Sequence, residues 1–163
     1  METYHLRRSE RAITDPEALR EILTTQKTMT LALAWDGEPY LVTVNYGYDP
    51  TSQRLYFHCA DEGKKVRYLD ANPKVWGQIV DDWGYVPGTC DHAFRSVHFG
   101  GTVRWVEDTE EKRDALTMMI EHLEPDPEPV KDRQVKAASL RRVRVGCIEI
   151  HGMSGKQNVP EAD

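Results

Sequence analysis

Much of the chain alternates with a period of two, which is the pattern of β-strands and not of helices. Over residues 29–34 large apolar side chains alternate with small ones, and Asp36-Gly37 follows directly. Alternation of this kind places every second side chain on one face of a sheet, and Asp-Gly is a strong signal for a two-residue hairpin turn. Residues 40–48, rich in β-branched and aromatic residues, then form the return strand. The sequence therefore predicts an antiparallel hairpin near its start.

Four more strands are predicted, over residues 55–60, 75–80, 97–106 and 143–150. Residues 83–94 carry two glycines and a proline, so we expect a long loop there. Five strands in near-hairpin succession and a sixth that returns late indicate an antiparallel barrel with a few helices outside it. A doubly wound parallel sheet is not expected, because the helix between neighbouring strands is missing where that fold needs one.

Helices are predicted where a capping residue precedes an apolar repeat of helical spacing. Thr14 or Asp15 starts the first helix, and Glu17 completes a capping box if Thr14 is the cap. Asp108 starts another, with Glu111 in the capping-box position. The remaining predictions are a short helix opening at residues 63–65 and ending at 72–73, an extended proline linker over 124–129 and a helical turn over 137–140.

A chain of 163 residues is long enough to bury one core without disulfide or metal support. We expect a single domain over residues 1–156 and a flexible tail over 157–163. The net charge of −6 argues against a dedicated nucleic-acid binder, which normally carries a basic face. The charge is uneven, however. Residues 107–128 carry a net −7, whereas residues 131–144 carry +5 and could meet an anionic ligand, a neighbouring subunit or only water.

The composition also bears on the compartment. No apolar run approaches the roughly 20 residues of a membrane span, and residues 1–11 hold no apolar segment of a signal peptide. Cys59, Cys90 and Cys147 cannot all pair within one chain. We therefore expect a cytoplasmic protein with reduced thiols and no membrane partner.

Five segments occur in a fixed order: LVTVNYGY at 41–48, YFHCADEGKK at 56–65, NP at 72–73, RSVHFGG at 95–101, and IEI followed by GK within 148–156. Together they resemble the FMN-binding split-barrel proteins related to pyridoxamine 5′-phosphate oxidase, and most of all their nitroimidazole-resistance (Nim) branch. The resemblance covers roughly residues 5–156. It implies an α+β, mainly antiparallel fold, namely a split β-barrel with peripheral helices. It also implies a homodimer with FMN at the interface.

A lysine pair fits the phosphate of such a cofactor. Lys64 and Lys65 follow Gly63 at the predicted start of a helix, where backbone N–H groups and the helix dipole favour anions. Two surface lysines would give the same dipeptide, and only the resemblance assigns these two to the phosphate. The resemblance also places Arg95 and Ser96 at the cofactor, where a guanidinium can fork onto phosphate and a hydroxyl can donate to it.

For the isoalloxazine ring, the resemblance indicates the strand of Val42, Thr43, Val44 and Asn45. An ordinary core strand would show the same alternation. His58 has two readings, a structural histidine or a flavin-site residue. The resemblance favours the second, and a pKa near 6.5 would let His58 donate a proton or a hydrogen bond to a nitro or carbonyl oxygen.

A metal site is not expected. His58, Cys59, Cys90 and His92 are ligand types, but no CxxC or HxxxH pair occurs, and His58 and Cys59 point to opposite faces of one strand. Cys59 is expected to pack as a small apolar residue, and Cys90 to be an exposed thiol in a loop.

Three functions remain open at this stage. The first is an FMN-dependent oxidoreductase that reduces a small nitroaromatic such as a 5-nitroimidazole, or another small acceptor, with NADH or NADPH as a candidate donor. The second is a flavin carrier or sensor without catalysis. The third is a haem-binding relative, for which His58 or His98 would be the ligand. No contact set for pyridoxal phosphate is visible, so pyridoxamine phosphate oxidation itself is not predicted.

Overall fold

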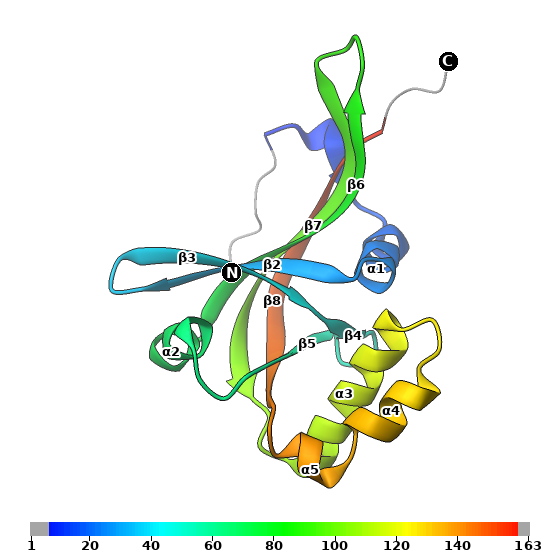
Figure 1. Ribbon diagram of the computed structural model, residues 1–163. Helices are drawn as coiled ribbons and strands as arrows, with labels where there is room; N and C mark the ends of the chain where they lie inside the picture. The colour runs from blue at the N-terminus through cyan, green and yellow to red at the C-terminus, as the bar shows by residue number, and fades with distance from the viewer. Residues whose placement is uncertain (1–6, 160–163) are drawn as a thin grey trace.

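One antiparallel sheet of eight strands organises the molecule (Figure 1). The computed structural model describes residues 7–159. The strands are β1 (Ala12–Ile13), β2 (Thr28–Trp35), β3 (Glu38–Asn45), β4 (Gly47–Asp49), β5 (Arg54–Cys59), β6 (Lys74–Val86), β7 (Asp91–Trp105) and β8 (Arg144–Asn158). Their order is β3-β2-β6-β7-β8-β5-β4, with β1 also beside β8. The order is linear, so the sheet is not a closed barrel, and the predicted α+β, mainly antiparallel split barrel is confirmed.

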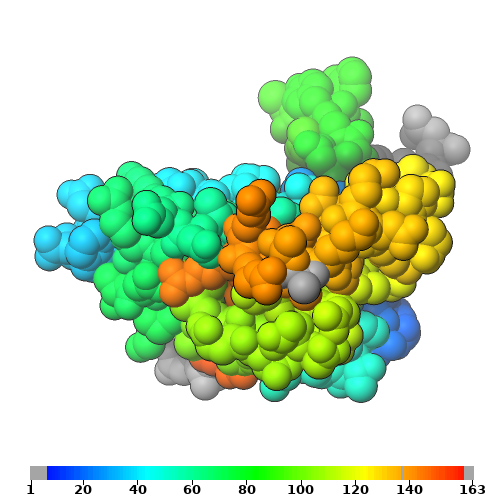
Figure 2. All heavy atoms as spheres, turned by 60° about the horizontal axis from the view of Figure 1, so that its bottom comes forward, coloured from blue at the N-terminus to red at the C-terminus, as the bar shows by residue number. Residues whose placement is uncertain are grey.

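Short helices pack around this sheet. They are the 3-10 turn η1 (Ser9–Arg11) and the α-helices α1 (Pro16–Thr25), α2 (Lys64–Ala71), α3 (Thr109–Leu123), α4 (Glu128–Gln134) and α5 (Ala137–Leu140). Figure 2 shows α3, α4 and α5 gathered on one face, with the β6–β7 hairpin projecting beyond the body of the molecule. No helix in the described part of the chain combines the length and apolar character that a membrane crossing requires.

The first hairpin is confirmed. Asp36 and Gly37 connect β2 to β3 with φ of 51° and 77°, and positive φ at both central residues is what the favoured hairpin turn requires. The return strand is shorter than predicted and is interrupted at Tyr46, which separates β3 from β4. Tyr46 is fully buried, and its hydroxyl donates to the Leu23 carbonyl at 2.8 Å.

The prediction of a loop over residues 83–94 was wrong. β6 and β7 pair from Lys74–Thr102 to Val86–Asp91 and form one long hairpin. The residues that suggested a loop have local roles instead. Gly84, with φ of 91°, lies where the register shifts, and Gly88, with φ of 82°, belongs to the turn. β8 is also longer than predicted. It ends at Asn158, inside the segment expected to be a tail, whose residues 160–163 lie outside the described part.

The helix signals were largely correct. Asp15, and not Thr14, caps α1, because its side chain accepts from the Glu17 N–H at 3.0 Å. Asp108 caps α3 and accepts from the Glu111 N–H at 2.8 Å. The proline linker is shorter than expected, since Pro127 is already helical and α4 begins at the next residue.

Two apolar clusters hold the fold together. The larger lies inside the curled sheet, and the smaller lies between the sheet and α3 and α5. Two glycines make room for aromatic rings in the core. A Cβ on Gly77 would lie 2.1 Å from the Phe99 ring, and one on Gly146 would lie 2.4 Å from the Phe57 ring. Close packing of this kind tolerates no added atom without displacement of the ring.

Candidate functional site

The N-terminus of α2 brings together several of the residues singled out from the sequence. Gly63 precedes the helix with φ of 141°, which side chains rarely adopt, and no side chain caps the helix. No acidic residue lies in the first turn, where acids would suit the dipole. Instead the helix begins with Lys64 and Lys65. Cations at this end oppose the helix dipole, whereas an anion would complement both the lysines and the free N–H groups. We call Gly63, Lys64, Lys65, Tyr40 and His58 the α2 corner.

Aromatic rings hold both lysines in this corner. The Lys64 ammonium lies 4.5 Å from the centre of the Tyr40 ring on β3 and 5.4 Å from that of Tyr68 on α2. The Lys65 ammonium lies 5.6 Å from the centre of the Phe57 ring on β5. Lys64 is exposed and Lys65 is half-buried. These cation–π contacts join β3, β5 and α2 around one corner of the sheet.

His58 lies on the same side of the molecule as Lys65. On β5 Phe57 points into the core, and the neighbouring His58 is exposed. Loss of solvent around the imidazole and the nearby Lys65 charge lower the pKa of His58. His58 is therefore neutral at pH 7, with one ring nitrogen that donates and one that accepts.

The predicted ring-binding strand divides between two faces. Val42 and Val44 point inward, where Val44 is part of the core. Thr43 and Asn45 are exposed on the opposite face. Thr43 shares a hydrogen bond of 3.0 Å with the Thr30 hydroxyl, and the Asn45 amide donates to the Lys27 carbonyl at 3.1 Å. β3 is at the end of the strand order, so its backbone offers an edge to a ligand.

Arg95 and Ser96 lie far from the α2 corner within one chain. The Arg95 guanidinium donates to Asp81 at 2.8 Å and to Glu21 of α1 at 2.8 Å. These two carboxylates raise the pKa of Arg95, and a phosphate would have to compete with them. Ser96 is buried on the other face of β7, and its hydroxyl donates to the Lys156 carbonyl at 3.4 Å. α1, which holds Glu21, ends just before the start of β2. α2 lies against the other end of β2, where the Asn72 amide donates to the Ala34 carbonyl.

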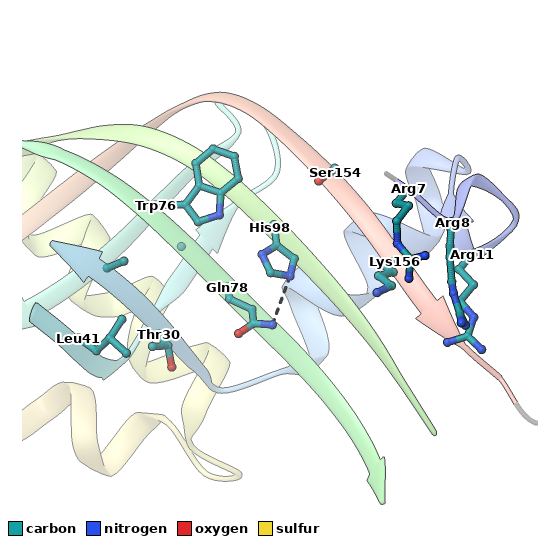
Figure 3. A pocket seen from close by; sticks show the side chains of 12 residues that line it. Arg7, Arg8, Arg11, Thr30, Leu41, Trp76, Gln78, His98, Ser154 and Lys156 are labelled. Atoms are coloured by element: carbon teal, nitrogen blue, oxygen red, sulfur yellow. Dashed lines mark hydrogen bonds between the residues drawn. The ribbon is translucent and has the colours of Figure 1, made fainter. Parts of the chain in front are cut away.

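A pocket on the outer face of the sheet was missed by sequence reasoning. The register places Thr30, Gln78, His98 and Ser154 side by side across β2, β6, β7 and β8. A cavity of about 750 Å³ lies on this face, and we call it the outer-face pocket (Figure 3). The cavity is bounded by Arg7, Arg8, Arg11, Thr30, Ala32, Leu41, Trp76, Gly77, Gln78, His98, Ser154 and Lys156.

His98 lies at the centre of this pocket, and Figure 3 shows its ring beside Gln78. The two side chains form a hydrogen bond of 3.2 Å between the His98 Nε2 and the Gln78 Nε2. Partial burial and the Lys156 charge lower the pKa of His98. The ring is therefore neutral at pH 7.

The cysteines show no shared site. Cys147 is buried, Cys59 is half-buried and Cys90 is exposed in the turn between β6 and β7. Within residues 7–159 no three side chains of histidine, cysteine, aspartate or glutamate gather in a way that could hold a metal ion.

Comparisons with known proteins agree with this architecture. Residues 15–157 match the family model described as pyridoxamine 5′-phosphate oxidase. A search of curated proteins found no match. Among solved structures, a candidate 5-nitroimidazole antibiotic resistance protein from Bacteroides thetaiotaomicron is 28% identical, with a TM-score of 0.75 over 89% of this chain and 85% of that one.

Two more distant structures share the fold. The flavocytochrome Anf3 from Azotobacter vinelandii is 21% identical, with a TM-score of 0.81 over 99% of this chain and 76% of that one. An FAD and haem binding protein from Mycobacterium smegmatis is 19% identical, with a TM-score of 0.77 over 94% of this chain and 77% of that one. The match to the family model covers most of the chain, and the chain therefore belongs to the pyridoxamine 5′-phosphate oxidase family.

Proposed function

We propose that this protein binds FMN and is an oxidoreductase that reduces a small nitroaromatic or a similar acceptor. The observation that carries the proposal is the α2 corner, where two lysines open a helix that has no side-chain cap. A phosphate monoester brings about −1.5 to −2 charges at neutral pH and three acceptor oxygens. Lys64, Lys65 and the first N–H groups of α2 would bind it there.

The isoalloxazine would lie along β3. The strand offers backbone donors and acceptors at its free edge, and Thr43 adds a hydroxyl on the exposed face. A flavin nucleotide in its mononucleotide form suits this corner, since one phosphate meets one cationic site. The flavocytochrome and the Mycobacterium smegmatis protein named above bind flavin together with haem. The 28% identical protein from Bacteroides thetaiotaomicron is described as a nitroimidazole-resistance protein.

A homodimer completes the proposed site. Leu41, Trp76 and Val80 are exposed on the outer face of the sheet, with 68%, 41% and 38% of their surface accessible. Apolar side chains gathered on one face are typical of a surface that meets a partner. The contact to the cofactor that the resemblance assigns to Ser96 would then come from the second copy.

The chemistry follows from the cofactor and one side chain. When bound and reduced, a flavin supplies two electrons, and a nitro group that takes up two electrons and two protons becomes a nitroso group with loss of water. His58 would act on the substrate. Its neutral ring can donate an N–H to a nitro oxygen and so hold the group in place as negative charge develops on it.

The visible spectrum of the purified full-length protein tests the cofactor. Two flavin bands that bleach with dithionite support the proposal. A colourless protein that takes up neither FMN nor haem would refute it. Anaerobic reduction of a 5-nitroimidazole with NADH or NADPH then separates an enzyme from a flavin carrier, which would bind FMN without turnover.

Haem binding is the second candidate, and His98 favours it. This histidine is half-buried in the outer-face pocket and is neutral at pH 7, which is the form that ligates iron. A Soret band in the purified protein, lost in His98→Ala but kept in His58→Ala, would establish haem and displace the flavin proposal.

A further inference from the structure

The charges on α2 oppose its helix dipole at both ends. The helix begins with Lys64 and Lys65 and carries Asp70 in its last turn. A helix dipole favours anions at the N-terminus and cations at the C-terminus, which is the reverse of this arrangement. With eight residues, α2 is also shorter than the helices that persist alone in water. Contacts with the sheet must therefore hold α2 in place.

Asp70 is the residue through which two strands hold the last turn of α2. The Trp105 indole, at the end of β7, donates to Asp70 Oδ1 at 2.7 Å. The Arg144 guanidinium, at the start of β8, donates to Asp70 Oδ2 at 3.3 Å and lies 4.2 Å from the centre of the indole ring. Each carboxylate oxygen thus has its own donor, and one of the donors is charged. The two bonds fix the direction of the carboxylate relative to the sheet.

The same indole connects this end of α2 to the lysine at its other end. The Trp105 ring meets the Phe57 ring edge-on, with the ring centres 6.1 Å apart. Phe57 is fully buried, and its ring is the one that the Lys65 ammonium approaches to 5.6 Å. Gly146 packs against this ring so closely that a Cβ there would lie 2.4 Å from it. Phe57 therefore has little freedom to move, and Lys65 and Trp105 both pack against a fixed ring.

We propose that Asp70 is a positioning residue for the phosphate site of the α2 corner. Its bonds to Trp105 and Arg144 hold the helix axis, so that Lys65 and the first N–H groups of α2 converge on one place. Asp70 itself lies five residues from Lys65, or about 8 Å along the helix axis, and is assigned no contact with the cofactor. This inference rests on the proposed FMN site.

The sign of the effect separates positioning from simple charge. Asp70 is negative, so its field at the N-terminus of α2 repels a phosphate. If charge alone mattered, Asp70→Ala would tighten FMN binding. If Asp70 positions the helix, the same substitution weakens it.

Titration of the full-length apoprotein with FMN and with riboflavin, which lacks the phosphate, tests the role. Asp70→Ala should raise the FMN dissociation constant about threefold to tenfold and leave that of riboflavin unchanged. Asp70→Asn keeps an acceptor for the indole N–H and should retain most of the affinity. The effect of Asp70→Ala should shrink when Lys65 is already alanine, because part of what Asp70 positions is then missing.

Amide hydrogen exchange without FMN measures the support of the helix directly. Asp70→Ala should speed the exchange of the α2 amides, because the last turn loses its bonds to β7 and β8. The matched control is Asp114→Ala, which removes the same charge at an exposed position of α3. This control should change neither α2 exchange nor the affinity for either ligand.

Three results would overturn this inference and leave the FMN proposal standing. They are unchanged exchange of the α2 amides in Asp70→Ala, FMN binding by that variant that is equal or tighter, and an equal loss of FMN and riboflavin affinity. The last of these would show that Asp70 supports only the fold. A failure of the proposed function looks different, since the unmodified protein would then bind no FMN, and the positioning role would fall with it.

Discussion

Replacing the two lysines of the α2 corner should weaken FMN binding unequally. Lys65 is half-buried beside Phe57, whereas Lys64 is exposed over Tyr40. A hydrogen bond to a charged group contributes about 1.5–3 kcal/mol, and an exposed ion pair contributes about 0.2–1 kcal/mol. Because 1.4 kcal/mol is a factor of ten, Lys65→Ala should raise the FMN dissociation constant about tenfold to a hundredfold. Lys64→Ala should raise it by about fivefold at most.

The measurement is quenching of flavin fluorescence on titration of apoprotein with FMN, at fixed ionic strength. The double variant Lys64→Ala with Lys65→Ala should lose at least tenfold, and its two effects need not add because both lysines contact one phosphate. Riboflavin, which lacks the phosphate, serves as the ligand control. Its affinity should be the same for the unmodified protein and for all three variants.

Two outcomes would contradict this reasoning. Unchanged FMN affinity in the double variant would show that the phosphate lies elsewhere. An equal loss of FMN and riboflavin affinity would show that the lysines support the fold of the corner and do not bind the phosphate. Arg133→Ala with Lys136→Ala removes the same charge far from the corner and should leave both ligands unaffected.

Three further predictions concern single side chains. Tyr46→Phe removes the hydroxyl that donates to the buried Leu23 carbonyl and should lower the free energy of unfolding by about 1–3 kcal/mol in urea denaturation, whereas Tyr85→Phe, at an exposed site, should not change it. Lys65→Met should raise the pKa of His58 in an NMR titration because it removes a nearby positive charge, and Lys64→Met should leave that pKa in place. The Arg104 guanidinium lowers the pKa of Glu111. The pair therefore stabilises the fold fully at pH values above the ordinary pKa of a glutamate, and this stabilisation is lost as the pH falls through the lowered pKa. In acid, the free energy of unfolding should therefore fall less steeply with decreasing pH in Glu111→Gln than in Glu38→Gln. The same pH dependence in both variants would exclude this role for the pair.

Local signals predicted much of the fold, including the helix that begins at the α2 corner. The Asp36-Gly37 turn and the Asp108 cap depend on neighbours within a few residues, and each was predicted correctly. The helix start at Lys64 is a local pattern of the same kind, whereas only the resemblance assigned Lys64 and Lys65 to a phosphate, which stays a prediction. The β6–β7 hairpin was missed because two glycines, which elsewhere mark loops, here form a bulge and a turn inside a paired ladder. Sequence alone does not show that the opposite strand continues beside them.

The outer-face pocket could not be predicted in the same way, because its basic end joins residues 8 and 11 to residue 156. The pairing of Ala12 with Lys156 spans almost the whole chain, and no periodicity carries that information. One signal was present in the sequence. Arg8 and Arg11 are spaced by three just before a two-residue strand, a spacing that puts both on one side of a 3-10 turn. Without the partner strand, that spacing indicates only an exposed basic turn.

The separation of the two predicted phosphate contacts bears on the oligomer. The Lys64 ammonium lies over the ring of Tyr40 on β3, and Tyr40 pairs with Leu33 of β2. Ser96 of β7 pairs with Val80 of β6. Val80 lies two residues beyond Gln78, which pairs with Thr30 of β2. Five residues along the strands and three strand spacings across them separate the two sites by about 20 Å. One phosphate cannot contact Lys64 and Ser96 of the same chain at that distance. If both residues contact the phosphate of one FMN, they must belong to two different copies of the chain. An experiment that confirms both contacts would therefore also show that the protein is a homodimer.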